Sequence, residues 1–414
     1  MEQYQSVDEL LNRRDVKRAE ILIARFLRAD PSVQERAHLL VARARARLLS
    51  ARIDDALEDL HTARTLLPDD FQTPQTLELL GDAHFARFEL ASVGFADRSD
   101  TVHALDAYDR ILADYPLYNN RGWVFYQRGR VLLTENRSDD SLECFQQALL
   151  AQSTVPALTA YCYERMGFVA SYERREFDRA LSFLNKAVAT YPTNEDRRWL
   201  VHIHTLRSRV LREMHDYDAA VEAANTAISV AASAEGKAGL ADALLTTAEM
   251  LALVEGRERD VIAHLQHYIQ ITKKPLGIDV TWSRIHEMLG DAYFASSQLP
   301  TAVAAYQAAL QFNPYTPWEL SLHYRIARTL YQMGDYEKTI QAVGKMFQAA
   351  AADGQSVGDY RVYNILGNAH FALQNYPEAA IAYQTALQMA PASSDSLDKI
   401  RQYHQFALDL SRPI

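Results

Sequence analysis

Two pairs of histidines are the residues in this sequence that come nearest to a metal or catalytic site. The stretch HLQH places His264 and His267 three residues apart, so both imidazoles would lie on one face of a helix. A zinc site needs further ligands, and none is marked by its spacing. In the stretch HIH, His202 and His204 are two residues apart and would lie on different faces. We interpret all four as surface or packing residues and expect neither a metal nor another cofactor.

Signatures of enzymes are missing from the sequence. It has no glycine-rich phosphate loop, no nucleophile elbow and no cysteine pair at zinc-binding spacing. The two cysteines, Cys144 and Cys162, fall in apolar helical patterns, which predicts buried thiols that serve packing. We therefore predict a protein that is not an enzyme.

The composition excludes several classes of partner. The chain has 414 residues, 53 of them acidic and 43 basic, and its net charge is −10. No run of Lys and Arg forms a basic stripe, so we expect neither nucleic acid nor an anionic membrane surface as the main partner. No apolar stretch approaches the roughly 20 residues that span a bilayer, and the first residues lack the apolar core of a signal peptide. A soluble cytoplasmic protein is expected.

One short phrase occurs three times. It reads LGDAHFA at 80–86, LGDAYFA at 289–295 and LGNAHFA at 366–372. The longer stretches 289–314 and 366–391 align without a gap, and each contains two amphipathic helical patterns separated by a short break. The repetition therefore indicates a copied structural unit rather than a copied catalytic motif.

Small residues in this unit have a packing role. Gly290 on the first helix and Ala302 on the second would let the two helices approach closely, while Tyr306 fills the space between pairs. Pro314 follows the second helix because proline cannot continue it.

This pattern resembles the tetratricopeptide repeat, which has Leu-Gly, Tyr, Ala, Phe/Tyr, Ala and Pro at set positions and a period of 34 residues. The matching units are 37–68, 74–116, 122–153, 160–192, 201–232, 242–273, 289–314, 320–351 and 366–391. The resemblance implies an all-α fold, a right-handed superhelical α-solenoid of antiparallel helix pairs with about nine repeats and terminal capping helices. We expect one continuous superhelix from residue 6 to residue 410.

The expected organisation has three parts. Residues 1–36 form an amino-terminal half-repeat with capping helices, 37–391 form the repeat array, and 392–414 form a carboxyl-terminal capping helix. The repeat at 74–116 is longer than the others, and its surplus lies in residues 87–104, which we expect to project beyond the helix pair with Gly94 near a turn.

In the tetratricopeptide family the first helices line a concave groove that holds a peptide or a protein. The positions that the resemblance assigns to partner binding are Trp123, Tyr126, Arg130, Tyr324, Arg328, Tyr331, Arg361, Asn364, Asn368 and Phe371. Rings would supply rigid contact, Asn would pair with the ligand backbone, and Arg would grip a carboxylate. The expected partner is therefore a protein or peptide, and the side chains favour an acidic or carboxylate-bearing segment.

Two alternatives at these positions stay open. Some of the rings could pack on neighbouring helices, and the capping helix could fold over the carboxyl-terminal set. Asp82 and Asp291, which follow the repeat glycine, could either contact a partner or be solvated in the groove.

The function predicted first is a non-catalytic interaction scaffold or adaptor that binds a segment in the groove. A ligand-sensing module, whose superhelical pitch responds to a small molecule or peptide, is the second hypothesis. It is motivated by the long steps of 41 residues between Ser208, Glu249 and Gly290, similar to the extended repeats of some bacterial transcription regulators. A self-assembling structural protein is the third.

Overall fold

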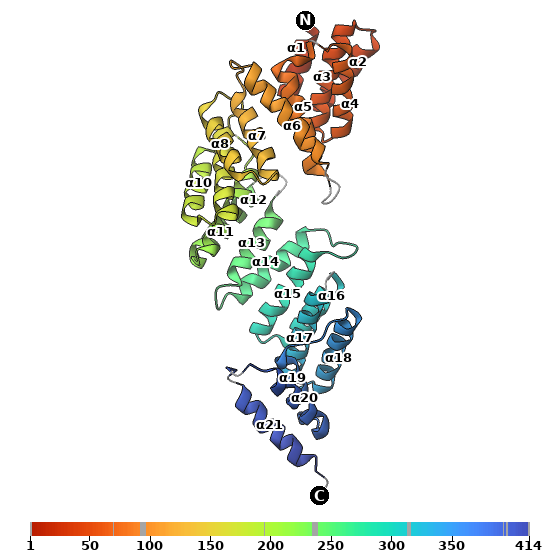
Figure 1. Cartoon of the computed structure of the whole chain (residues 1–414), viewed down its shortest axis with the longest axis vertical. Helices are drawn as coiled ribbons and strands as arrows, with labels where there is room; N and C mark the ends of the chain where they lie inside the picture. Colours follow the sequence, from red (N-terminus) through yellow and green to blue (C-terminus); the bar gives the residue numbers. More distant parts are fainter. Residues whose placement is uncertain are drawn as a thin grey trace. The chain divides into compact units, whose positions relative to one another are not determined.

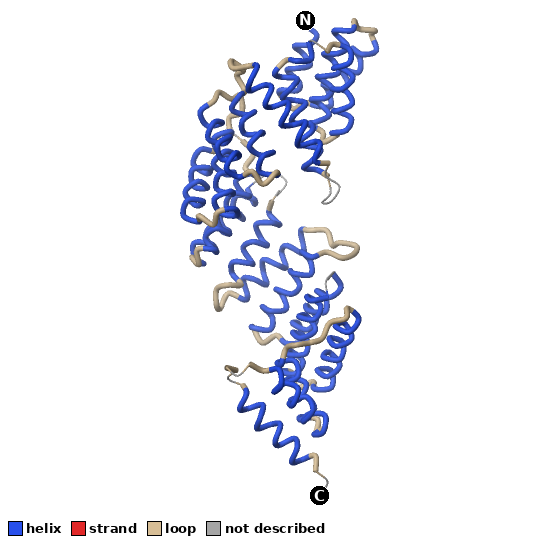
Figure 2. Tube along the Cα trace, in the orientation of Figure 1, coloured by secondary structure: helices blue, strands red, loops and turns tan. Residues whose placement is uncertain are grey.

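The computed structural model is helical throughout its described part (Figures 1 and 2), which comprises residues 2–68, 70–91, 97–193, 195–233, 239–312, 316–391, 393–394 and 396–412. Within these residues there is no strand, and consecutive helices pair antiparallel, so the predicted all-α solenoid of helix pairs is confirmed. The helices fall into two compact units, Met1–Asp196 and Arg197–Ile414, where the sequence predicts a single array. Each unit is described by itself.

In its described residues, the first unit contains four helix pairs preceded by the helices α1 and α2. Its elements are α1 (Glu2–Asn12), α2 (Val16–Arg28), α3 (Val33–Leu49), α4 (Ile53–Leu66), the 3-10 turn η1 (Asp70–Gln72), α5 (Pro74–Leu90), α6 (Arg98–Asp114), α7 (Arg121–Thr134), α8 (Ser138–Leu150), α9 (Leu158–Phe168), the π-helical turn η2 (Val169–Glu173) and α10 (Phe177–Thr190). The first helices of its repeats are α3, α5, α7 and α9.

The second unit contains five helix pairs and a terminal helix. Its elements are α11 (Arg198–Glu213), α12 (Tyr217–Ser233), α13 (Leu240–Leu251), α14 (Glu258–Ile271), α15 (Val280–Ala295), α16 (Leu299–Phe312), α17 (Thr316–Gln332), α18 (Tyr336–Ala352), α19 (Tyr360–Ala372), α20 (Tyr376–Met389) and α21 (Leu397–Leu410). The pair α13–α14 forms where the repeat pattern is weakest.

The repeated phrase marks a contact between a glycine and a tyrosine ring. The pairs are Gly81 with Tyr108, Gly290 with Tyr306, and Gly367 with Tyr383. A Cβ atom on Gly367 would lie 2.7 Å from the ring of Tyr383, which is closer than van der Waals contact allows. All three rings are fully buried. Glycine is therefore needed here because the second helix of the pair leaves no room for a side chain on the first.

The residue after each of these glycines completes the contact. The tyrosine hydroxyls donate hydrogen bonds to Asp82, Asp291 and Asn368, at 2.7, 2.7 and 2.8 Å respectively. The phrase thus encodes both a close approach of two helices and an acceptor for the one polar atom of the buried ring.

A left-handed residue ends the first helix of most pairs. Examples are Asn136, Ser297 and Gln374, whose φ angles are 59°, 59° and 62°. The backbone N–H that follows each bonds to a carbonyl five residues earlier, as in Asn375 to His370 at 2.9 Å. This is the hydrogen bond of a Schellman motif, which closes a helix and reverses the chain.

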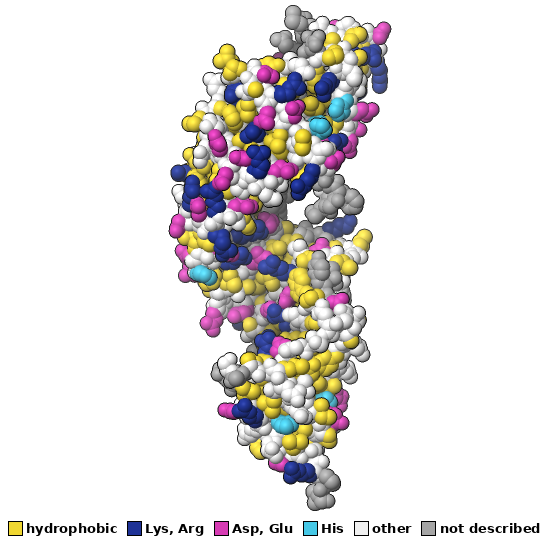
Figure 3. All heavy atoms as spheres, viewed as in Figure 1, with side chains coloured by type: hydrophobic (Ala, Val, Ile, Leu, Met, Phe, Trp, Pro, Cys, Tyr) yellow, Lys and Arg dark blue, Asp and Glu magenta, His cyan; other side chains and the backbone are white. Residues whose placement is uncertain are grey.

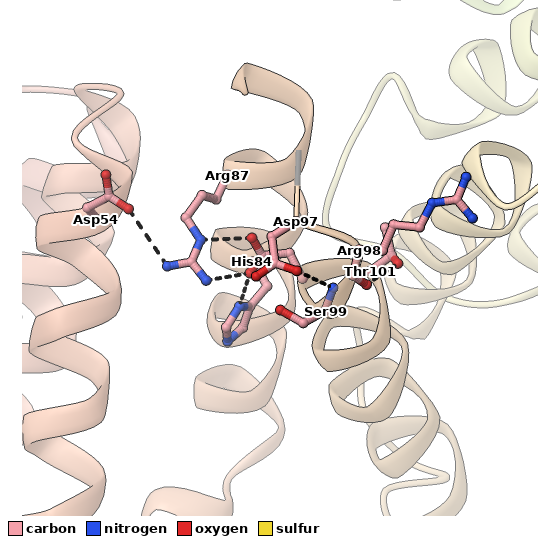
Figure 4. Close-up of polar contacts among 8 residues, drawn as sticks. Asp54, His84, Arg87, Asp97, Arg98, Ser99 and Thr101 are labelled. Atoms are coloured by element: carbon pink, nitrogen blue, oxygen red, sulfur yellow. Dashed lines mark hydrogen bonds and ion pairs between the residues drawn. The ribbon is translucent and has the colours of Figure 1, made fainter. Parts of the chain in front are cut away.

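The long repeat is built differently from the prediction. Residues 87–90 extend α5 and residues 98–104 begin α6, so most of segment 87–104 is helical and belongs to the pair itself. Gly94 lies outside the described residues. Figure 4 labels His84 and Arg87 of α5 and draws their polar contacts near this point. Both side chains contact Asp100 on α6, at 2.7 Å from the imidazole Nδ1 and 2.6 Å from the guanidinium Nη2.

The terminal helix α21 packs on the last repeat. Ile400 and Ala407 are buried, and the ring of Tyr403 lies 5.6 Å from that of Phe371 and 6.2 Å from that of Tyr383. The expected capping helix is therefore present, and it covers part of the last pair.

We predict that the glycine–ring contact can be tested with single methyl groups. Gly290→Ala should lower the free energy of unfolding by about 1–3 kcal/mol, because the new Cβ meets Tyr306. Gly344→Ala, in the middle of α18 with nothing within 4 Å, should raise it by up to about 1 kcal/mol through helix propensity. Denaturant unfolding of the two variants measures both effects, and equal shifts would contradict the packing described here.

Gly354, the loop position that sequence register alone suggests as a control, is not suitable. Its φ of 66° strains any side chain placed there, although nothing lies within 4 Å.

The left-handed turns allow a second prediction. Gln374→Gly should stabilise the protein by about 0.5–1 kcal/mol, because glycine adopts positive φ without strain. Gly334 occupies the equivalent turn of the preceding pair with φ of 80°, so Gly334→Gln should destabilise by a similar amount. Thermal unfolding of both variants tests the pair, and shifts of the same sign would show that the turn geometry does not decide stability.

Candidate binding groove

A cavity of about 1100 Å³ opens in the first unit between the first helices of three successive repeats. Its lining comes mainly from α3 and α5, with residues of α1, α4, α7 and nearby loops. The titratable residues that line it are Asp8, His38, Arg45, Glu78, Asp82, Glu89, Tyr118 and Arg130. We call this space the groove cavity.

Glu78 lies on the α5 wall of the groove cavity. Its carboxylate accepts hydrogen bonds from the Tyr118 hydroxyl at 2.9 Å and from the Asn120 amide at 2.9 and 3.0 Å. Asn120 is held in turn, because its oxygen accepts from the Thr154 backbone N–H at 3.0 Å. Burial, together with the negative charge of Asp82 one helical turn away, raises the pKa of Glu78 to about 8.

Asp82 is the second carboxylate of the cavity. It accepts from the Tyr108 hydroxyl at 2.7 Å, the Gln127 amide at 3.0 Å and the Trp123 indole N–H at 3.4 Å. Burial raises the pKa of Asp82 above its ordinary value despite these hydrogen bonds. Every hydrogen-bond donor to Glu78 and Asp82 in the described part of the chain is thus an uncharged group.

The two arginines that line the cavity are engaged with other partners. Arg130 stacks on Phe85, with its Cζ 4.8 Å from the ring centre, donates to Gln127 at 2.8 Å and pairs with Glu89. Arg45 donates to the Asn12 side chain at 2.9 Å. Among the ion pairs of the described residues, none includes Glu78 or Asp82, so the acidic pair has no cation of the chain bound to it.

The structure divides the predicted residues of the first unit. Trp123 and Arg130 belong to the hydrogen-bonded network at the cavity. Tyr126 is buried, 7% exposed, and packs against Phe145 and Tyr161 with ring centres 5.8 and 6.0 Å apart. For Tyr126 the alternative interpretation, packing on neighbouring helices, describes the contact.

In the second unit, the predicted arginines stack on rings. Arg361 pairs with Asp359 at 2.7 Å and its Cζ lies 5.7 Å from the centre of the Tyr324 ring. The Arg328 guanidinium lies 4.2 Å from the centre of the Phe294 ring. These side chains therefore already have partners within the unit.

The remaining predicted residues of this unit lie on α17 and α19. Tyr331 packs on Tyr336, with ring centres 5.6 Å apart, and Asn364 is half-buried on α19. Asn368 accepts the hydroxyl of Tyr383, and Phe371 packs against α21. Helix α21 thus contacts Phe371, and the side-chain oxygen of Asn368 accepts the hydroxyl of the buried Tyr383.

Three residues of the groove cavity were not singled out from the sequence: Glu78, Tyr118 and Asn120. Glu78 precedes the repeated phrase and could have been noticed by its spacing of four residues from Asp82, which places both on one helical face. Tyr118 and Asn120 lie in the loop after α6, and no periodicity marks them.

Other predicted features have these outcomes in the structure. Cys144 and Cys162 are free and buried, as expected, and burial raises the pKa of Cys162 to about 12. Among the described residues, no group of three or more His, Cys, Asp or Glu is placed to hold a metal ion. No helix in the described part is long and apolar enough to cross a membrane.

Residues 360–393 match the family described as tetratricopeptide repeat. The chain therefore contains a tetratricopeptide repeat at 360–393. The matched segment covers the last helix pair, α19–α20, where the glycine–ring contact and the closing proline are both present. No curated protein sequence matches the chain.

Several solved structures match this chain at low sequence identity. The carboxyl-terminal part of a repeat-containing protein from Cytophaga hutchinsonii matches with a TM-score of 0.50 and 14% identity, over 70% of this chain and 100% of that one. PilF of Pseudomonas aeruginosa has a TM-score of 0.43 and 18% identity, covering 61% and 96%. A tetratricopeptide repeat protein from Parabacteroides merdae has a TM-score of 0.42 and 12% identity, covering 69% and 98%. The first of these similarities supports the fold alone.

We predict that Glu78 makes stability depend on pH. Its pKa is about 8 in the folded protein against an ordinary 4.5, so between these values the folded state binds more protons and stability falls as pH rises. Relative to Glu78→Gln, the wild type should lose about 1–3 kcal/mol of unfolding free energy between pH 5 and pH 9. Urea unfolding across this range measures the difference.

Glu58→Gln, on the exposed side of α4, is the matched control and should keep the pH dependence of the wild type. If Glu78→Gln also keeps it, Glu78 is ionised in the folded state at neutral pH and the environment described above is wrong.

Proposed function

We propose that the protein is an interaction scaffold that holds an extended segment of a partner protein in the groove cavity. The observation that carries this proposal is the cavity itself, because about 1100 Å³ of space between α3, α5 and α7 exceeds what a single side chain fills. The tetratricopeptide-repeat fold supports a role in protein–protein interaction in general. The described residues also contain no cluster placed to hold a metal ion.

We further propose that the bound segment presents a basic side chain to Glu78 and Asp82. These carboxylates lie one helical turn apart, accept hydrogen bonds only from uncharged donors, and repel each other. Arg45 and Arg130 attract this pair without hydrogen-bonding to it. A guanidinium or ammonium group between the two carboxyl groups would stabilise their ionised forms directly, and each charged hydrogen bond would be worth about 1.5–3 kcal/mol where water is excluded. The ion pair between Arg130 and Glu89 lies at the same cavity, and we expect it to contact and orient the neighbouring part of the bound segment.

This partner chemistry differs from the carboxylate-bearing segment predicted from the sequence. That prediction rests on arginines of the second unit, and Arg361 is already paired with Asp359. Binding of a carboxylate at the carboxyl-terminal set, pitch-dependent sensing and self-assembly all stay predictions.

A positional-scanning library of fluorescent hexapeptides tests the proposal with the full chain, by anisotropy at 150 mM salt and pH 7. We expect peptides with Arg or Lys at one position to bind about tenfold more tightly than peptides with Ala there. Glu78→Gln combined with Asp82→Asn should abolish this preference, because the two amides keep an acceptor oxygen but cannot ionise when a cation binds.

Glu58→Gln is again the matched control and should leave the preference unchanged. Failure of every hexapeptide to bind would overturn the scaffold proposal at this groove. Binding without preference for a basic residue would leave the groove as the site and refute the role given to the acidic pair.

A further inference from the structure

A second pocket, of about 230 Å³, lies between α4, α5 and α6 of the first unit. Its charged and histidine lining consists of His61, Arg64, His84, Arg87, His103, Asp106 and Arg110. We call it the His/Arg pocket. It shares only Phe71 with the residues that line the groove cavity, so it is a separate feature of the unit.

Each of the three helices brings one histidine and one arginine to this pocket. On α4 and on α5 the two residues are three positions apart, and on α6 they are seven apart. Both spacings place side chains on one face of a helix. The imidazoles lie together, because the His84 ring centre is 4.9 Å from that of His103 and 6.2 Å from that of His61.

Asp100 fixes the orientation of two of these side chains (Figure 4). His84, which is almost fully buried, uses Nδ1 to contact Asp100 at 2.7 Å, so Nε2 is the ring nitrogen left for the pocket. Arg87 donates hydrogen bonds from Nε and Nη2 to the same carboxylate, at 2.8 and 2.6 Å. Its Nη1 is only 3.7 Å from Asp54, whose side chain is 87% exposed, so this weak surface pair can be exchanged for a ligand.

The other two arginines of the pocket, Arg64 and Arg110, have fewer acidic partners than Arg87. Among the ion pairs of the described residues none includes Arg64, which is exposed, and Arg110 donates to the uncharged Gln72 side chain. Asp106 is the one carboxylate that lines the pocket in the part of the chain that the structure describes. Three guanidinium groups therefore line the pocket beside Asp106, and Arg87 among them is also paired with Asp100 and Asp54. Figure 3 shows basic and acidic side chains interspersed over one face of the molecule.

We propose that the His/Arg pocket binds a phosphate group. Arginine presents a fork of N–H donors that matches a tetrahedral oxyanion, and imidazole N–H groups add further donors. The guanidinium groups of Arg64 and Arg110 supply the attraction, and Asp100 holds the Arg87 guanidinium in a fixed orientation as a further donor. His84 donates its Nδ1–H to Asp100 and burial lowers the pKa of His84, so its Nε2 is an acceptor and the imidazole donors come from His61 and His103. The phosphate is either free in solution or carried on a serine of a partner protein, and both sources present the same group to the pocket.

Isothermal titration of the full chain at pH 7 and constant ionic strength tests the proposal. The probes are inorganic phosphate, an acetylated and amidated Ala-phosphoserine-Ala peptide, and its unphosphorylated form. We expect saturable binding of at least one phosphate probe and none of the unphosphorylated peptide. Arg64→Gln and Arg110→Gln should each weaken binding about tenfold.

Arg36→Gln, on α3 and 3.6 Å from Asp30, is the matched control and should leave the affinity unchanged. Thermal unfolding without phosphate should show that Arg64→Gln, on an exposed side chain, retains the fold. Tighter binding of the phosphopeptide than of inorganic phosphate identifies a phosphorylated partner as the source, and the reverse order identifies free phosphate. Absence of saturable phosphate binding, or equal loss in Arg36→Gln and Arg64→Gln, overturns the proposal.

Discussion

The contact between a glycine of one helix and a tyrosine ring of the next is the constraint on which each of these repeats depends. Without a side chain at Gly81, Gly290 or Gly367, the ring of the second helix lies directly on the backbone of the first. The tyrosine hydroxyl then needs an acceptor, and the next residue of the phrase provides it. Packing therefore requires a polar residue at this position of the first helix, because it must accept the tyrosine hydroxyl. Any contact of that residue with a partner is additional to this structural role.

This constraint explains how far sequence could predict the structure. The glycine, the ring and the closing proline recur at recognisable positions, so the helix pairs could be predicted from the residues themselves. The same register assigned Tyr126 and Phe371 to a groove, and it could not show what packs over them. Tyr126 meets Phe145 and Tyr161, and Phe371 meets α21. Periodicity gives the face of a helix on which a residue lies, but coverage of that face depends on elements distant in the sequence.

The acidic pair of the groove cavity illustrates the same limit. Asp82 was noticed because it follows the repeat glycine, yet its neighbour Glu78 becomes unusual only through Tyr118 and Asn120, about forty residues further along the chain. Those two residues lie in an irregular loop that no pattern predicts. What raises the pKa of Glu78 is burial by these distant residues together with the nearby Asp82 charge, so the chemistry of the site is a tertiary property.

Helix α5 lines both cavities. It presents acidic residues to the groove cavity and His84 and Arg87 to the His/Arg pocket. Glu78 and Asp82 are four residues apart and line the groove cavity, whereas His84 and Arg87 are three apart and line the His/Arg pocket. Asp82 and His84 are two positions apart, which rotates them by about 200° around the helix axis. The long repeat makes this arrangement possible, because the extended α6 places Asp100 where it can hold His84 and Arg87 away from the acidic face. The two cavities therefore share one helix, so a substitution that displaces α5 would disturb the lining of both.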